Sequence, residues 1–431
     1  MPATYVKSKL DEPFLVTVLL VTMYWPPAGG AGVQRPLKFA THLPALGIET
    51  HVLAPDDPKW IHRDDELVSP TQAWVHRARY VGPKGRRPAE ELHGAGALER
   101  AAKMALLTYR RVLVPDENVT WNATAIPAAV RVVRSEGIDV VVTTSPPNSV
   151  HLVGAAVKRI TGVTWVADVR DSMLRNADRP VERLAARAKE RTQETIARLI
   201  ARYADASVAV SDFIAEELRS LGPRGEVSVI PNGADFDDFA GLEYRANGRF
   251  RVTHTGAMFG KRDPRPFLTA FARADLADSV ARFVGDFRQA DREWAEGRGL
   301  GERLELHPYV PRRRSLALQR DSEANLLLMP EVPGRGSGVI AAKVFEYLAA
   351  ERPIIAAVPP DGATAAFVRD AEAGVIVAPD DVDALEEALR DLHARWEAGS
   401  LKGTTLSPEL RTRLDRRTRA EELARVLRDL S

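Results

Sequence analysis

Short apolar segments alternate with longer amphipathic segments along most of the chain. Apolar segments rich in β-branched residues predict buried strands, and the amphipathic segments between them predict helices. The strands expected in the first half lie at residues 16–21, 50–54, 138–144, 164–169, 206–210 and 227–230. Those expected in the second half lie at residues 249–256, 280–284, 303–306, 325–329, 353–358 and 375–378. This alternation predicts an α/β fold with parallel sheets that are covered by helices on both faces.

A polar segment interrupts the alternation and predicts a division into two units. Residues 233–248 (GADFDDFAGLEYRANG) are rich in turn formers, and the strand–helix pattern restarts after them. At about 100–200 residues per domain, 431 residues allow two or three domains. We predict two tandem Rossmann-like domains at residues 1–240 and 241–405, with a cleft between them. Residues 406–431 predict a charged helix that packs on one of the domains, and we assign it to the N-terminal one.

Composition excludes several classes of function. Hydrophobic content is 45% and charged content 28%, as in ordinary globular proteins, and a net charge of +1 argues against a nucleic-acid partner. The chain has no cysteine, which excludes disulfides, thiolate nucleophiles and zinc–sulfur sites and fits a cytoplasmic location. The apolar residues 14–25 are too few to span a bilayer and follow Asp11 and Glu12, so we expect a buried strand rather than a signal peptide.

The first candidate for phosphate binding lies in the second half of the chain. Residues 336–339 (GSGV) precede a predicted helix, and the free N–H groups and the dipole of a helix N-terminus attract phosphate. Glu346 follows two turns later, about 12 Å along the helix at 1.5 Å per residue, where its carboxylate suits a ribose. Lys343 precedes it by three residues. The alternative is a solvated Glu–Lys pair on an ordinary surface helix.

Two adjacent cations form the second candidate. In HTGAMFGKRDP a strand ends at Gly256, and Lys261 and Arg262 precede the next predicted helix. Such a pair can neutralise a diphosphate. Because Asp263 follows directly, a solvated basic turn is the alternative.

In the first half, polar residues follow several predicted strands. Residues 24–35 (YWPPAGGAGVQR) contain Gly30 and Gly32 but carry Arg35 in place of the last glycine of G-x-G-x-x-G, and they do not form a P-loop. Two other strand ends read TTSPPNS and DVRD, and ligands bind at the carboxyl ends of such strands. The candidates for contacting a bound molecule are Arg35, Ser145, Asn148, Asp168, Arg170 and Asp171. A structural Arg–Asp pair is the alternative for the DVRD residues.

Together these stretches, in this order, resemble one family along almost the whole chain. The stretches are YWPPAGGAG, WVADVRDS, IPNGADFDDF, THTGAMFGKRDP and GVIAAKVFEYLAAERPIIA. They resemble the glycosyltransferases of the GT-B fold, specifically retaining family 4. The resemblance implies two Rossmann-like domains and a hexosyltransferase-like transfer from a nucleotide-diphosphate sugar, without a bound metal or a further cofactor. It also implies an acceptor that is a carbohydrate, a lipid-linked molecule or a small molecule.

The resemblance assigns roles to individual residues. Glu346 would hold the ribose, the backbone of Gly338 and Val339 would meet the diphosphate, and Lys261 or Arg262 would stabilise the leaving phosphate. The assigned catalytic residues are Lys261, Arg262 and Asp168. The assigned donor-binding residues are Gly30, Gly32, Gly256, Gly338, Val339, Lys343 and Glu346. The assigned acceptor-binding residues are Arg35, Ser145, Asn148, Arg170 and Asp171.

One position departs from the family pattern. Many members carry a second glutamate eight positions before the ribose-binding one, where this chain has Gly338. Two other functions therefore stay open: a non-transferring enzyme on the same fold, such as a sugar-nucleotide 2-epimerase, and a catalytically silent scaffold. The Asp-x-Asp of residues 235–237 is also compatible with a metal site, but it follows a turn rather than a strand end.

Arginine recurs at every fourth position from Arg175 to Arg191, which makes a basic stripe on a helix. A solvated face is one interpretation, because neighbouring glutamates offset the charge. The other is peripheral docking on anionic lipid headgroups at the inner face of the cell membrane. Residues 98–115 are a second basic amphipathic candidate, although their apolar residues would equally suit a protein core.

Overall fold

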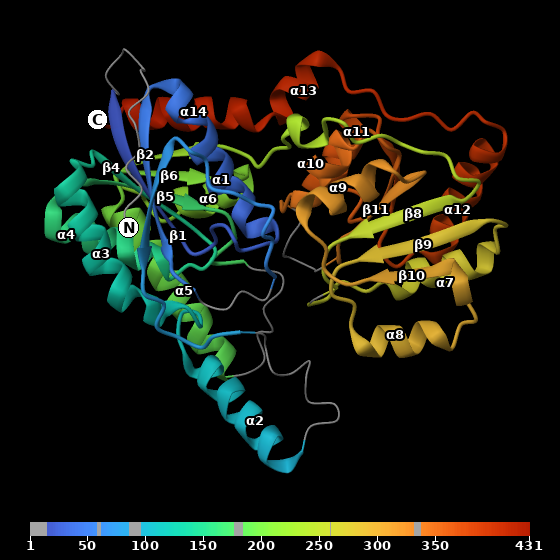
Figure 1. Ribbon diagram of the computed structural model, residues 1–431, viewed down its shortest axis with the longest axis horizontal. Helices are drawn as coiled ribbons and strands as arrows, with labels where there is room; N and C mark the ends of the chain where they lie inside the picture. The colour runs from blue at the N-terminus through green and yellow to red at the C-terminus, as the bar shows by residue number, and fades with distance from the viewer. Residues whose placement is uncertain (1–14, 58–61, 86–95, 176–183, 259, 332–337) are drawn as a thin grey trace.

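The computed structural model describes residues 15–57, 62–85, 96–175, 184–258, 260–331 and 338–431. Within them the chain forms two α/β units that lie side by side (Figure 1). The predicted arginine stripe at residues 175–191 falls partly outside the described residues.

The first unit is built on a parallel sheet that has seven strands in the described part of the chain. Its order is β3-β2-β1-β4-β5-β6-β7, so the chain starts in the middle and extends the sheet first in one direction and then in the other. The strands are β1 (Val16–Thr22), β2 (Ile48–Pro55), β3 (Ala73–Ala78), β4 (Val140–Thr144), β5 (Thr164–Val169), β6 (Ala206–Ala209) and β7 (Glu226–Val229). The helices are α1 (Ala31–His42), α2 (Ala97–Val112), α3 (Asn122–Glu136), α4 (Val150–Thr161), α5 (Leu184–Tyr203) and α6 (Asp212–Arg219).

The second unit repeats the plan with a smaller parallel sheet in the order β10-β9-β8-β11-β12-β13. Its strands are β8 (Phe250–Thr255), β9 (Ser279–Val284), β10 (Leu304–His307), β11 (Ala324–Leu328), β12 (Ile354–Ala357) and β13 (Gly374–Val377). Its helices are α7 (Arg265–Ala274), α8 (Gln289–Glu296), α9 (Arg312–Arg320), α10 (Ala342–Ala349), α11 (Ala363–Asp370) and α12 (Val382–Glu397). Short 3₁₀ turns lie at η1 (Pro44–Leu46), η3 (Val119–Trp121), η4 (Phe236–Phe239) and η5 (Gly301–Arg303).

The hydrophobic pattern predicted these strands to within two residues at each end, with one omission. Strand β3 lies in the region that the sequence presents as irregular, and it forms an edge of the first sheet. Only its last residue, Ala78, is buried, and Trp74 is 48% exposed. An edge strand needs little apolar surface, so its sequence carries a weak hydrophobic signal.

Strand β1 shows why a parallel sheet needs apolar residues at consecutive positions. Val18 and Leu20 join a cluster that includes residues of α1, whereas Leu19 and Val21 join a cluster that includes residues of α3 and α4. Successive side chains of a strand point to opposite faces, and both faces of this sheet are covered. Residues 16–22 of the predicted apolar run are therefore a core strand, as predicted.

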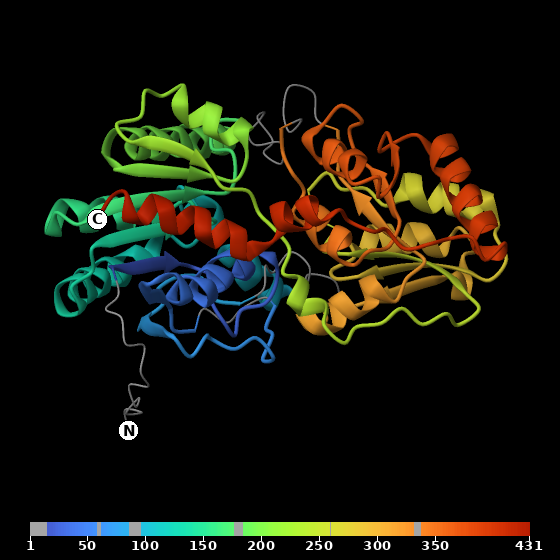
Figure 2. The same cartoon turned by 90° about the horizontal axis from the view of Figure 1, so that it is seen from above.

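The chain crosses from one unit to the other at two points that lie next to each other. The first crossing is near Ala234, and the second connects α13 (Pro408–Leu414) with α14 (Arg416–Arg428). Ala234 N donates to Leu414 O at 2.8 Å, and Arg416 N donates to Ala234 O at 3.0 Å. Backbone hydrogen bonds thus join both connections into one junction, which Figure 2 shows beside the start of α14.

Helix α14 lies along the first unit, although the residues before it belong to the second (Figure 2). Its buried side chains Ala420, Leu423 and Leu427 belong to the same apolar cluster as α1 and β1. Arg428 Nη2 also donates to Leu46 O. The last helix is thus part of the core of the first unit.

Helix α2 projects away from the rest of the first unit (Figure 1). It exposes large apolar side chains, among them Leu98 at 90% and Val112 at 66%. None of the described helices combines the length and the apolar character that a transmembrane helix requires.

The packing of α14 predicts a large effect of one substitution. Leu423 is 1% exposed, so Leu423→Ala should lower the free energy of unfolding by about 2–5 kcal/mol. Urea titration followed by circular dichroism measures this loss. The control Glu421→Ala changes an exposed side chain on the same helix and should have an effect of at most about 0.5 kcal/mol. Equal midpoints for the two variants would contradict the packing described above.

Candidate active site between the two units

A cavity of about 330 Å³ lies between the two units. The first unit contributes Gly30, Ala31, Gln34 and His62 to its wall. The second unit contributes the ends of β8, β9 and β11 and the beginnings of α9 and α10. The predicted cleft between two Rossmann-like units is therefore present, at the carboxyl ends of parallel strands, where such folds bind ligands.

Helix α10 presents its N-terminus to this cavity. Its apolar residues Val344, Phe345 and Leu348 are buried in the second unit, and this packing fixes the helix. Ala341 and Ala342 line the cavity at its first turn. The first N–H groups of a helix have no partner within the helix and carry its positive dipole end. This end of the cavity can therefore hold an anion.

Glu346 lies one turn further along α10 and is 6% exposed. Its Oε1 accepts from Arg312 Nη1 at 2.8 Å, and its Oε2 accepts from Lys343 Nζ at 2.8 Å and Gln319 Nε2 at 3.3 Å. Burial alone would raise the pKa of this carboxyl, but the positive charges of Lys343 and Arg312 outweigh burial and hold the pKa well below its ordinary value. Glu346 is thus an ionised acceptor on the cavity wall.

Arg312 connects this carboxylate to the first unit. Its Nη2 and Nε donate to Asp238 Oδ2 at 3.0 and 3.1 Å, and Asp238 Oδ1 accepts from Lys38 Nζ at 2.7 Å. The backbone N–H of Arg312 donates to Asp64 Oδ2 at 2.7 Å. Opposite charges therefore alternate from Lys38 on α1, through the linker, to Glu346 in the cavity.

A second contact between the units closes another side of the cavity. The ring of His62 stacks on Tyr309 with centroids 4.4 Å apart. His62 Nε2 lies 3.1 Å from Asp286 Oδ2. All three residues line the cavity, so the first unit contacts the second through the cavity wall itself.

The two cations predicted near β8 have different positions. Arg262 is partly exposed and lines the cavity, and it lies close enough to affect the pKa of His254. Lys261 is exposed and does not belong to the cavity lining. The structure therefore favours Arg262 over Lys261 as the residue that faces a bound phosphate.

The phosphate contact predicted at Gly338 and Val339 needs correction. Helix α10 begins at Ala342, later than the glycine loop suggested, and neither residue lines the cavity. A Cβ on Gly338 would lie 2.3 Å from the Cβ of Phe213, so the glycine allows the second unit to approach α6 of the first. Val339 O accepts from Thr364 Oγ1 at 3.0 Å. The backbone at the helix start is that of Ala341, Ala342 and Lys343.

The three other predicted glycines divide between two environments. Gly30 and Gly256 line the cavity. Gly256 has φ +145°, and a Cβ there would lie 3.5 Å from His254 Nε2, so the absent side chain leaves space beside that ring. Gly32 lies outside the lining, and a Cβ on it would lie 2.9 Å from the ring of Tyr24. We therefore assign Gly32 to packing.

Arg35 and Asp168, predicted to contact substrates, instead form a buried ion pair. Arg35 Nη2 donates to Asp168 Oδ1 at 2.8 Å, and Nη1 donates to Pro231 O at 3.0 Å. Asp168 Oδ2 also accepts from Thr144 Oγ1 at 2.6 Å. The two residues are 5% and 1% exposed. Burial would raise the pKa of Asp168, but the Arg35 charge and these hydrogen bonds lower it. The pair is structural and joins α1, β4 and β5.

The remaining acceptor-side candidates differ in exposure. Ser145 is fully buried, and its Oγ accepts from Arg170 N at 3.3 Å. Asn148 is 7% exposed and donates to Gln193 Oε1 at 2.6 Å. Both are thus within the core. Arg170 is partly exposed and donates to Gly32 O at 3.0 Å, and Asp171 is exposed, so these two remain accessible at the end of β5.

Sequence reasoning missed several residues that only the fold brings to the cavity wall, Arg312, His62, Tyr309, Asp286 and His254, and the buried Gln319 that donates to Glu346. Arg312 begins a run of three arginines after a predicted strand, which was the available signal. The suspected metal ligand Asp235 accepts from Lys38 at 2.5 Å. Within the described ranges, the structure has no cluster of three histidine or acidic side chains that could hold a metal ion.

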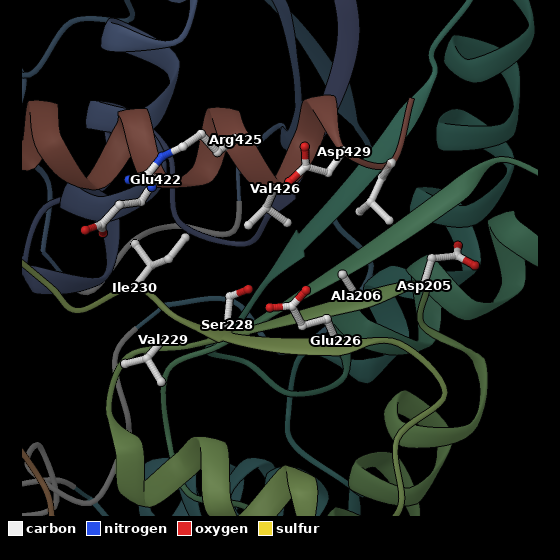
Figure 3. Close-up of a pocket in the computed structure, with 11 residues that line it drawn as sticks. Asp205, Ala206, Glu226, Ser228, Val229, Ile230, Glu422, Arg425, Val426 and Asp429 are labelled. Carbon is white, nitrogen blue, oxygen red and sulfur yellow. The ribbon is translucent and has the colours of Figure 1, made fainter.

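A separate cavity of about 530 Å³ lies between strands β6 and β7 and helix α14 (Figure 3). Its polar lining is mainly acidic and includes Glu226, Glu422 and Asp429. It lies within the first unit, away from Arg262, Lys343 and Glu346. Its acidic lining does not suit a nucleotide diphosphate.

The buried Arg35–Asp168 pair allows a test of whether Asp168 has a structural or a catalytic role. Asp168→Asn leaves Arg35 without a counter-charge and should lower the free energy of unfolding by about 3–5 kcal/mol. Because the folded-state pKa of Asp168 is lowered, its contribution is present above the unfolded value of about 3.9 and is lost as pH falls through the folded-state pKa. Denaturant titrations from pH 7 to pH 3 measure both effects. Asp171→Asn, at an exposed position, is the control. Unchanged stability in Asp168→Asn would argue against the structural assignment.

The chain matches models of known protein families in both units. Two family models match, glycosyl transferase 4-like domain at residues 29–233 and glycosyl transferases group 1 at residues 249–395. No curated protein sequence matches the chain significantly.

Solved structures similar to this chain include sucrose-phosphate synthase from Thermosynechococcus elongatus, with a TM-score of 0.65, 17% identity, and coverage of 96% of this chain and 99% of that one. Anabaena HepE in complex with UDP and glucose has a TM-score of 0.60, 15% identity, and coverage of 96% and 100%. A putative UDP-N-acetylglucosamine 2-epimerase from Listeria monocytogenes has a TM-score of 0.52, 12% identity, and coverage of 95% and 94%. These likenesses show the GT-B fold, and the two family models, which together match most of the chain, show that it belongs to the glycosyltransferases, with a glycosyl transferase 4-like domain followed by a group 1 domain.

Proposed function

We propose that the protein transfers a sugar from a nucleotide-diphosphate sugar to an acceptor hydroxyl, with retention at the anomeric carbon, in the biosynthesis of a polysaccharide, glycolipid or other glycoconjugate. The observation that carries the proposal is the cavity between the units. It brings together the N-terminus of α10, the cations Arg262 and Lys343, and the ionised carboxylate of Glu346.

A nucleotide-diphosphate sugar would lie along this arrangement, with its diphosphate at one end and its ribose at the other. The diphosphate would lie at the start of α10, between Arg262 and Lys343, where the helix dipole and both cations favour negative charge. Glu346 would accept hydrogen bonds from the ribose hydroxyls. A carboxylate has about four acceptor positions, so its bonds to Arg312, Lys343 and Gln319 leave room for the ribose.

The chemistry needs stabilisation of the leaving group. As the bond between the sugar and the diphosphate breaks, negative charge grows on the departing phosphate. Arg262, Lys343 and the first N–H groups of α10 are fixed before the reaction and would stabilise that charge without reorganisation. The proposal needs no resident cofactor and assigns no separate general base.

The two units would divide the substrates between them. We propose that residues 1–240 form the acceptor side and residues 241–405 the donor side. The accessible Arg170 and Asp171, at the end of β5, are the first-unit residues that we assign to the acceptor. The loop at Gly30 and Ala31 would close over the donor from across the cavity.

Two other functions use the same fold. A sugar-nucleotide 2-epimerase would convert a UDP-sugar without an acceptor, and one similar structure carries that putative description. A silent scaffold would bind nucleotide and turn nothing over. Product analysis after incubation with UDP-glucose separates the three: a glycosylated acceptor, an isomerised donor or unchanged donor.

Donor binding should stabilise the protein against heat. A nucleotide sugar at 100 times its dissociation constant adds about 2.7 kcal/mol to the free energy of unfolding. UDP-, GDP- and dTDP-sugars should therefore be screened by differential scanning fluorimetry, and we expect at least one to raise the melting temperature.

Glu346→Gln keeps the shape of the side chain and removes the charge, so it should abolish most of that ligand-induced rise. Glu351→Gln is the control, because this glutamate lies past the end of α10 and away from the cavity. If no nucleotide sugar changes the melting temperature of the unmodified protein, the proposed function is wrong. If Glu346→Gln keeps the full rise, only the ribose assignment fails.

We further propose that α2 places the protein on an anionic membrane surface. Leu98, Tyr109 and Val112 are 90%, 45% and 66% exposed on a helix that projects from the first unit (Figure 1). Their spacing of eleven and three residues puts them on one side of the helix. The sequence of α2 contains more basic than acidic residues. Such a helix suits the interface of a bilayer with anionic headgroups.

Binding to vesicles tests this contact. Leu98→Ser with Val112→Ser should weaken co-sedimentation with vesicles of phosphatidylglycerol and phosphatidylcholine by about tenfold or more, since each buried apolar side chain contributes about 1.5–3 kcal/mol. Ile160→Ser removes an exposed apolar side chain from α4 and should have no effect. Equal binding of all three proteins, or equal binding to vesicles without anionic lipid, would exclude this role for α2.

A further inference from the structure

His254 is a buried histidine on the wall of the donor cavity that the proposed mechanism does not use. It lies on β8, two residues before Gly256, and is 3% exposed. The ring lies 5.8 Å from the ring of Phe283 on β9. Strand β8 therefore holds the imidazole between the core of the second unit and the cavity.

The hydrogen bonds of His254 fix which nitrogen carries the proton. Nδ1 lies 2.8 Å from the carbonyl oxygen of Leu326, and a carbonyl only accepts, so Nδ1 is protonated. In the neutral ring Nε2 is then an acceptor. Among the described residues it has no hydrogen-bond partner.

The unpartnered nitrogen borders the space where the diphosphate is proposed to bind. A Cβ placed on Gly256 would lie 3.5 Å from His254 Nε2 and 3.7 Å from Lys343 Cε. The glycine therefore leaves open the volume between these two groups. Arg262 and the start of α10 line the same part of the cavity.

Burial, together with the neighbouring cations, keeps the ring neutral in the free protein. Burial lowers the pKa of His254 to about 3, and the positive charges of Arg262 and Lys343 lower it as well, although the Leu326 hydrogen bond opposes them. The other titratable or charged groups that line the cavity are His62, Asp286, Tyr309, Arg312 and Glu346. Because the ring is neutral, the positive charges of Arg262 and Lys343 favour the binding of an anion in this part of the cavity.

A bound diphosphate changes the balance at Nε2. Phosphate oxygens and an unprotonated Nε2 are both acceptors, so they repel each other at contact distance. We propose that Nε2 of His254 takes up one proton from solvent when the diphosphate of the nucleotide sugar binds, and that it then donates the new N–H to a phosphate oxygen. The ring gains one positive charge and returns the proton to solvent when the nucleotide leaves. The inference rests on the proposed function, because it requires the diphosphate in this cavity.

This proton makes binding depend on pH with a defined sign. Between the pKa of the free protein and the higher pKa of the complex, each bound nucleotide sugar takes up about one proton, and the affinity falls by up to about tenfold for each unit of rising pH. Above the pKa of the complex the affinity becomes constant. The additional donor would also stabilise the charge that grows on the departing phosphate.

Isothermal titration calorimetry with UDP-glucose tests the proposal. Titrations at pH 6, 7 and 8, each in two buffers of different ionisation enthalpy, give the number of protons taken up. A nucleotide sugar is preferable to UDP, because its diphosphate is esterified at both ends and does not itself titrate near neutral pH. We expect uptake of up to about one proton at pH 6 and a dissociation constant that increases from pH 6 to pH 8.

Two variants identify the group that takes up the proton. In His254→Asn the amide can still donate to Leu326 O but cannot be protonated, so uptake and the pH dependence should vanish while UDP-glucose still binds. His62→Gln changes the other histidine of the cavity lining and should retain the uptake. In the unmodified protein, ¹⁵N NMR should show Nε2 of His254 unprotonated when free and protonated with UDP-glucose.

The outcomes separate this inference from the proposed function. Binding of UDP-glucose without proton uptake, or uptake that persists in His254→Asn or disappears in His62→Gln, overturns the role of His254 and leaves sugar transfer intact. If neither UDP-glucose nor GDP-mannose or dTDP-glucose binds, the proposed function fails and this inference fails with it.

Discussion

A largely buried guanidinium joins several of the parts of the molecule that form the cavity. Arg312 is largely removed from water, so its charge has to be neutralised, and its partners Asp238 and Glu346 come from the linker and from α10. Its backbone N–H is held by Asp64 of the first unit. Removing one partner of a buried ion pair leaves an uncompensated charge, which costs about 3–5 kcal/mol. Arg312 therefore contributes both to the contact between the two units and to the orientation of Glu346.

The cations of the cavity set the charge of two neighbouring side chains. Glu346 is kept ionised by Lys343 and Arg312, whereas His254 is kept neutral by burial and by Arg262 and Lys343. Both groups are deprotonated for a related reason, because nearby cations stabilise a carboxylate and disfavour a protonated imidazole. The Arg35–Asp168 pair supports the opposite wall, since it holds α1 against the strand ends from which Arg170 projects.

Much of the architecture could be predicted from the sequence, whereas the site could be predicted only in part. The apolar runs predicted the strands because both faces of a parallel sheet are buried. Only the edge strand β3, which has one buried residue, was not predicted. Glu346, Lys343, Arg262, Gly30 and Gly256 reach the cavity as predicted, although their roles stay predictions. Gly338 and Val339 do not, because a glycine loop marks a helix start only to within a few residues and α10 begins at Ala342.

The sequence by itself determined the two α/β units, the linker between them and the family motifs, because hydrophobic periodicity and short motifs are local properties of the chain. The tertiary structure alone decided which charged residues meet. Arg35 and Asp168 are 133 residues apart, and His254 and Leu326 are 72 apart. No local pattern tells whether such a side chain contacts a substrate or neutralises a buried partner. Burial in the folded protein decides between these two roles, because it sets the free-energy cost of leaving a charge or a hydrogen-bonding group unpaired.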